Sequence, residues 1–218
     1  MQKKFAEIET VSCGEQPQTR RGQERRLALL LSANELFLEH GYDAVSLDDI
    51  VNHAGGSKAS IYKYFGNKEG LFTAIFDYRR SLFFKDICSC YNPEKDQLRH
   101  YLNQTLTNFY FHLKAPENIS FIRLIIEQTQ KNPELALYIH EKGAHFIQIT
   151  IAKALECAHQ QGLLECPSPL SSAMMYFGIL RDYEWRIIMG LEIAQPEQEV
   201  IKHIEYCVDH FLKGHQKV

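Results

Sequence analysis

Residues 55–68 read GGSKASIYKYFGNK. It contains three lysines and no acidic residue, although the 218-residue chain carries a formal net charge of −3. Ser57 is a suitable N-cap residue, and Ile61 and Phe65, four residues apart, would share the inner face of a helix. The stretch therefore predicts a short helix with a basic outer face.

Two further helices are predicted before this one. Apolar residues at helical spacing predict a helix over 24–40, and Ser46 followed by Asp49 predicts another over 47–54. Two short helices joined at a glycine turn let the second project, so that its side chains reach base edges in a DNA major groove. The projecting side chains would be Ser57, Lys58, Ser60, Tyr62 and Lys63, with the small Ala59 allowing close approach and Lys68 contacting a phosphate.

The stretch from Arg25 to Ile75 resembles a known DNA-binding domain. LFLEHGYDAVSLDDIVNHAG followed by SKASIYKYFGNKEGLF is similar, in order and spacing, to the helix-turn-helix of the TetR family. The family often has a hydrophobic residue where this chain has Gly56. The resemblance implies these DNA-facing positions: Ser57, Lys58, Ser60, Tyr62, Lys63, Tyr64 and Lys68.

The rest of the chain is also predicted to be helical. Prolines and the segment 162–169 divide it into helices near 68–90, 94–114, 117–131, 134–161, 168–190 and 197–213. The expected fold is all-α, with about nine helices. We expect an N-terminal arm (1–22), a three-helix helix-turn-helix DNA-binding domain (23–67), and a helical bundle for ligand binding and dimerisation (68–218).

A second resemblance covers roughly residues 117–190. FIRLIIEQTQKNPEL, QQGLLE and YFGILRDYEW are similar to the C-terminal domain of the AefR-like and AcrR-like branch of the same family. The resemblance implies a ligand-responsive dimerisation domain, and hence a homodimer that binds a palindromic double-stranded DNA operator and acts as a repressor.

The last two predicted helices carry the apolar surface expected at a dimer interface, because four such helices from two copies can form a bundle. The interface residues predicted on them are Met174, Phe177, Gly178, Ile188, Ile201, Ile204, Val208 and Phe211.

Aromatic and polar residues on apolar helices are candidates for binding a small apolar or aromatic effector. Plain core packing is the simpler interpretation of the aromatics, and a mutual ion pair that of Arg123 and Glu127, which lie four residues apart. The candidates are Phe84, Tyr101, Phe109, Arg123, Glu127, Tyr138, Phe146 and Trp185.

The composition argues against several other classes of protein. The six cysteines lack paired spacing and no apolar run approaches the length of a membrane span, so a cytoplasmic protein without a membrane partner is expected. No nucleophile elbow or phosphate-binding loop points to an enzyme, and no cofactor is expected. A helical adaptor that does not bind DNA remains the alternative, because fold alone does not decide function.

A metal site is not expected either. His140, Glu141 and His145 resemble a zinc-protease motif, but the histidines are five residues apart. In an α-helix that spacing separates them by roughly 140° around the axis, which is too far for one ion.

Overall fold

The computed structural model describes residues 15–87, 91–93 and 97–216, and these residues form eleven α-helices, one π-helix and no strand. The chain divides into two compact units, Met1–Arg80 and Ser81–Val218. The predicted all-α fold is confirmed.

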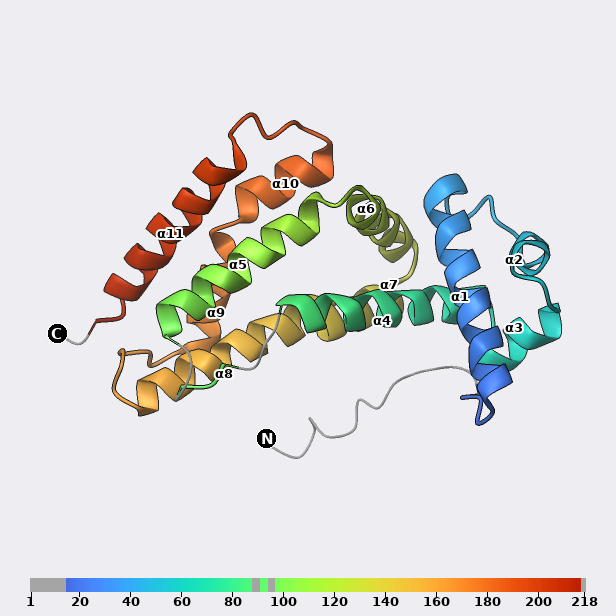
Figure 1. Cartoon of the computed structure of the whole chain (residues 1–218), viewed down its shortest axis with the longest axis horizontal. Coiled ribbons are helices and arrows are strands. Elements are labelled where there is room, and N and C mark those ends of the chain that lie inside the picture. Colours follow the sequence, from blue (N-terminus) through green and yellow to red (C-terminus); the bar gives the residue numbers. More distant parts are fainter. Residues whose placement is uncertain (1–14, 88–90, 94–96, 217–218) are drawn as a thin grey trace. The chain divides into compact units, whose positions relative to one another are not determined.

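Unit 1 contains α1 (Arg20–His40), α2 (Leu47–Ala54), α3 (Lys58–Phe65) and the first part of α4 (Lys68–Ile87), as Figure 1 shows. One apolar face of each helix forms the core of unit 1. Helices in proteins gain most of their stability by burying such a face against neighbouring elements. The buried side chains include Leu29, Leu30, Ala33, Phe37, Ile50, Ile61, Phe65, Leu71, Phe72 and Ile75.

The two units divide within α4, whereas the sequence suggested a boundary between residues 67 and 68. Leu71, Phe72 and Ile75 on the first half of α4 are buried in the core of unit 1, which explains why the division falls later, after Arg80. The first helix begins at Arg20, three residues inside the predicted arm, and residues 1–14 of that arm lie outside the described part.

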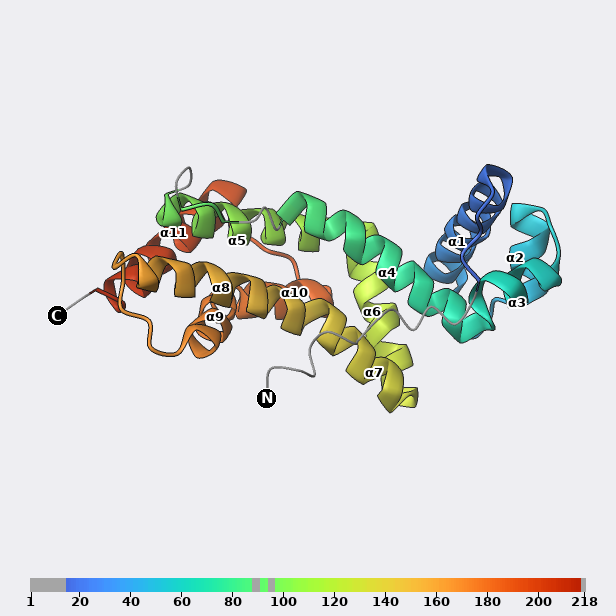
Figure 2. The same ribbon diagram turned by 90° about the horizontal axis from the view of Figure 1, so that it is seen from below.

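Unit 2 contains the end of α4 and the remaining helices, and Figure 2 shows α7, the π-helix and α8 as a continuous run. Helix α9 packs against α8, and α11 against α5. The core lies between these pairs and includes Leu102, Leu106, Tyr110, Ile151, Leu155, Ala173, Tyr176, Ile204 and Val208. The helices are α5 (Leu98–Lys114), α6 (Pro116–Lys131), α7 (Pro133–His140), η1 (Glu141–His145), α8 (Phe146–Gln160), α9 (Pro169–Gly178), α10 (Arg181–Met189) and α11 (Glu197–Lys213).

Two predicted helices are divided in the structure. The helix expected over 134–161 is interrupted by the π-helix η1, and the helix expected over 168–190 becomes α9 and α10. At the second break the N–H groups of Ile179 and Leu180 donate to carbonyls only three residues back, which tightens the turn after Gly178. Within the described residues, no helix has the length and apolar character needed to span a bilayer.

Candidate nucleic-acid interface

The turn before α2 is fixed by a capping box. The Asp49 N–H donates to Ser46 Oγ over 3.2 Å, and the Ser46 N–H donates to Asp49 Oδ2 over 2.7 Å. The Ser46 hydroxyl also donates to Asp49 Oδ2 over 2.6 Å, and this hydrogen bond, followed by the one from the Ser46 N–H, lowers the pKa of Asp49. Ser46 and Asp49 therefore fix the start of α2, and the sequence alone identifies them as a capping pair.

The turn between α2 and α3 depends on Arg25 of α1. Its guanidinium donates to the carbonyl of Gly55, and a Cβ placed on Gly56 would lie 2.5 Å from Arg25 Nη1. Gly56 also has a φ of +135°, a conformation that side chains disfavour. Gly56 stands where the family often has a hydrophobic residue. Here the Arg25 side chain occupies the space that the side chain of such a residue would need.

Helix α3 presents one face to the core and the other to solvent. Ile61 and Phe65 are buried, and the Arg26 guanidinium covers the Phe65 ring at 4.9 Å from its centre. On the opposite face Tyr62 is 54% exposed. The remaining predicted contact residues of this region divide into the exposed Ser57, Lys58, Ala59 and Lys63 and the half-buried Ser60 and Tyr64.

Two acidic residues from outside 55–68 pair with the lysines of α3. Asp48 Oδ2 lies 2.8 Å from Lys58 Nζ, and this hydrogen bond, followed by the charge attraction, raises the pKa of Lys58. Glu15 Oε2 lies 3.4 Å from Lys63 Nζ, and the Glu15 N–H donates to the Lys63 carbonyl over 2.9 Å. The sequence did not reveal these pairs because they depend on how the arm and α2 fold back onto α3.

Lys68, which was predicted to contact a phosphate, has protein partners in this structure. Its ammonium donates to the Tyr42 carbonyl and lies 4.3 Å from the centre of the Tyr42 ring. Burial lowers the pKa of Lys68, and burial, with Glu69 and Asp43, raises the pKa of Tyr42 to about 12. In this arrangement Lys68 ties the start of α4 to the loop before α2, and its charge is directed at protein.

Three of the eight predicted effector residues meet in a group of five phenylalanines in unit 2, which we call the aromatic cluster: Phe83, Phe84, Phe109, Phe146 and Phe177. Ring centres lie 4.7 Å apart for Phe84 and Phe146 and 6.0 Å apart for Phe109 and Phe177. The cluster joins the end of α4 to α5, α8 and α9. The end of α4 therefore packs against helices of unit 2 through Phe83 and Phe84, which are both half-buried.

The other effector candidates are scattered. Tyr101 is buried beside Tyr91, Tyr138 is half-buried on α7, and Trp185 is 58% exposed. Trp185 therefore lies on the surface of unit 2, and its role in effector binding stays a prediction. Its helix turns this side chain outward and buries Tyr183 and Ile187 instead.

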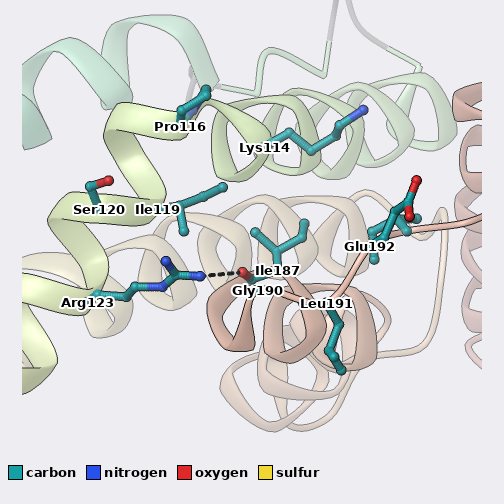
Figure 3. A pocket seen from close by; sticks show the side chains of 10 residues that line it. Lys114, Pro116, Ile119, Ser120, Arg123, Ile187, Gly190, Leu191 and Glu192 are labelled. Atoms are coloured by element: carbon teal, nitrogen blue, oxygen red, sulfur yellow. Dashed lines mark hydrogen bonds between the residues drawn. The ribbon is translucent and has the colours of Figure 1, made fainter.

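The expected ion pair between Arg123 and Glu127 is replaced by other partners. Arg123 Nε donates to the Ile188 carbonyl over 2.8 Å, and Glu127 pairs with Lys131 at 3.1 Å. The Ile188 carbonyl lies at the C-terminal end of α10, where the negative end of the helix dipole attracts the guanidinium. The cavity beside Arg123 has a volume of about 520 Å³. Figure 3 shows Arg123 at one side of it, with Lys114, Ser120, Ile119, Ile187, Leu191 and Glu192 among the lining residues.

The predicted dimer residues also separate into two groups. Ile204, Val208 and Phe211 are buried within the chain, so a partner cannot contact them, and this part of the prediction was wrong. Their stripe on α11 packs against α5, where Arg99 and Asp209 form a two-pronged ion pair. Met174 and Gly178 are exposed, whereas Phe177, Ile188 and Ile201 are half-buried.

Two family models match this chain, one within each unit. Residues 29–75 match the model described as bacterial regulatory proteins, tetR family, and residues 100–216 match the AefR-like transcriptional repressor C-terminal domain. The transcriptional regulator YezE of Bacillus subtilis is 30% identical over 151 residues, which cover 66% of this chain and 71% of YezE.

Other relatives match over shorter or more divergent stretches. The repressor ComR of Escherichia coli is 48% identical over 52 residues, so the match spans 24% of this chain and about a quarter (25%) of ComR. Among solved structures, a TetR-family regulator from Mesorhizobium loti superimposes with a TM-score of 0.81 at 24% identity, over 91% of this chain and 100% of the other. The flavonoid-responsive regulator FrrA gives a TM-score of 0.77 at 26% identity, over 88% and 97%.

Proposed function

Because this chain belongs to the TetR family of bacterial regulatory proteins, we propose that it represses transcription by binding operator DNA through the exposed face of α3. One observation carries the proposal: α3 buries Ile61 and Phe65 and leaves Tyr62 and two lysines facing solvent. A short helix anchored from behind is the form in which a helix enters a major groove. When DNA binds, its phosphate groups would displace Asp48 and Glu15 from the lysines. Alternatively, Asp48 and Glu15 would hold the lysine side chains in the orientation that contacts DNA.

The active form is a homodimer whose two α3 helices read a palindrome. One such helix contacts too few base pairs for selectivity, and two related helices double the site. The exposed apolar side chains of α9 and α10 support this assembly, because a monomer rarely leaves so many uncovered. They are Leu170, Met174, Met175, Trp185 and Met189.

The effector is an apolar or aromatic small molecule that inserts at the aromatic cluster. Phe109 of α5 packs there against Phe83 of α4, and Phe146 of α8 packs against Phe84, while Phe177 of α9 packs against Phe109. Helix α4 starts directly after the turn that follows α3. Inserting a molecule would shift α4 and thereby change the spacing of the two α3 helices. An effector can move this equilibrium only by its different affinity for the two spacings.

Selection from a pool of random duplexes by the full chain tests DNA binding and requires no candidate operator sequence. We expect a palindromic sequence, and an association constant that falls steeply with salt because lysines displace counterions from phosphates. A helical adaptor would enrich no sequence and would leave the DNA unbound at low salt.

The effector proposal is tested on the selected duplex with a panel of flavonoids, chosen because FrrA is described as flavonoid-responsive. Release of DNA by a flavonoid in the wild-type chain, reduced in Phe109→Ala, would support binding at the aromatic cluster. The double change Leu27→Ala and Leu31→Ala, at exposed positions of α1, is the matched control. Equal release from the Phe109→Ala variant would place the effector elsewhere.

A further inference from the structure

The π-helix η1 brings together two histidines that an α-helix would keep apart. His140 is the last residue of α7 and His145 the last of η1. Their ring centres lie 5.9 Å apart and the ring planes differ by only 22°. A π-helix closes hydrogen bonds to the fifth residue along, so that residue returns to the same face. The exclusion of a shared ion on the basis of sequence spacing assumed α-helical geometry, which the structure does not have here.

We propose that His140 and His145 bind a divalent transition-metal ion, such as Ni²⁺ or Zn²⁺, on the surface of unit 2. Imidazole nitrogen is a preferred ligand for these ions. With metal to nitrogen distances of about 2.0–2.1 Å, the centres of two coordinated rings lie roughly 4.5–6.4 Å apart, depending on the angle at the metal. The observed separation falls within this interval, so the two ring centres already lie at a distance that two ligands of one ion can have.

The surroundings of the pair leave it accessible. His140 is exposed and His145 half-buried, so an ion can approach from solvent. Among the described residues, no group of three potential metal ligands occurs. The site therefore has two protein ligands, and water completes the coordination.

The π-helix itself supports a binding role. Such turns are rare within α-helices and occur frequently at functional sites. Here the turn is flanked by regular helix, with α7 starting at the Asn132 cap and α8 continuing to Gln160. An ion that bridges the two histidines would favour the π turn over an α-helical register, because only the π turn aligns them.

A second pair on α11 provides a matched control. His203 Nε2 lies 3.6 Å from Cys207 Sγ, four residues along a regular α-helix. This pair contains comparable ligands without a π turn. Binding at α11 must be separated from binding at η1, because the chain has ten histidines in total.

Calorimetric titration of the full chain with NiCl₂ tests the proposal, using His140→Gln, His145→Gln and the control His203→Gln/Cys207→Ser. We expect each η1 variant to lose more than about tenfold in affinity, because even the loss of a group that only supports a metal ligand commonly costs that much. The control should retain the η1 site. Circular dichroism checks that the variants remain helical, and Ni²⁺ should raise the melting temperature of the wild-type chain but not of the His140→Gln variant.

Electron paramagnetic resonance with Cu²⁺ provides a readout that altered folding would not imitate. The wild-type chain and the control should show coupling to two imidazole nitrogens at this site, and His145→Gln should show one. Unchanged Ni²⁺ affinity in both η1 variants, or loss only in the control, would overturn the proposal.

Discussion

Helices α3 and α10 each expose one large aromatic side chain, but the neighbours of these side chains differ. Tyr62 on α3 is 54% exposed between Lys58 and Lys63, and Trp185 on α10 is 58% exposed on a helix that also exposes Met189. An aromatic ring among cations suits a polyanion, whereas a ring beside methionine suits an apolar protein surface. The comparison shows that the residues around an exposed ring, more than its exposure, indicate the partner.

The largest effect is expected when Lys58 and Tyr62 are both changed to alanine. This variant removes base and phosphate contacts together, so affinity for the selected duplex should fall several hundredfold. Lys202→Ala/Tyr206→Ala is the matched control, because it has the same spacing on α11 and a similar ion pair, Lys202 with Glu199. Fluorescence anisotropy measures both, and equal losses would remove the distinction between the two helices.

A smaller effect, on folding, is expected at Ile204. Replacement by alanine should lower the free energy of unfolding by about 3 kcal/mol, because the side chain is fully buried. Urea unfolding measures the change, and Ile201→Ala, on the half-buried side of α11, should cost clearly less. If Ile204→Ala altered only the dimerisation constant, the stripe would belong to an interface after all.

Trp185→Ala should weaken the dimer by about thirtyfold, as expected for a tryptophan at the centre of an interface. Sedimentation equilibrium gives the dissociation constant. Leu31→Ala, at an exposed apolar position of α1, is the control and should leave it unchanged. A dimer constant insensitive to Trp185 would show that exposed apolar side chains of α10 serve another partner.

The smallest effect is expected at the cap of α2. Ser46→Ala removes the hydroxyl that accepts the N–H of the third helical residue, and should lower the free energy of unfolding by about 1 kcal/mol. Thermal unfolding of unit 1 measures it. Ser46→Asp should recover most of the loss, and its failure to do so would mean that the hydroxyl acts through other contacts.

Local patterns predicted unit 1 better than unit 2. The faces of α3 follow from Ile61 and Phe65, four residues apart, and the cap of α2 follows from Ser46 and Asp49. By contrast, the stripe of Ile204 and Val208 shows only that something covers it, and the sequence does not say whether that is α5 of the same chain or a second copy.

The sequence also did not predict the long-range pairs or the irregular turn. Nothing in residues 55–68 indicates that Asp48 reaches Lys58, or that Arg25 fills the space beside Gly56. The π turn reversed an argument based on regular helical spacing, because one irregular turn changes the direction of every side chain after it. These features arise from tertiary packing.

Photocrosslinking from position 62 tests the central claim most directly. A benzophenone amino acid placed at Tyr62 should crosslink to the bases of a bound duplex, and the same group at Tyr206 of α11 should not. DNA binding that persists in both variants, with a crosslink at position 206 or at neither position, would contradict the assignment of α3 as the helix that enters the groove.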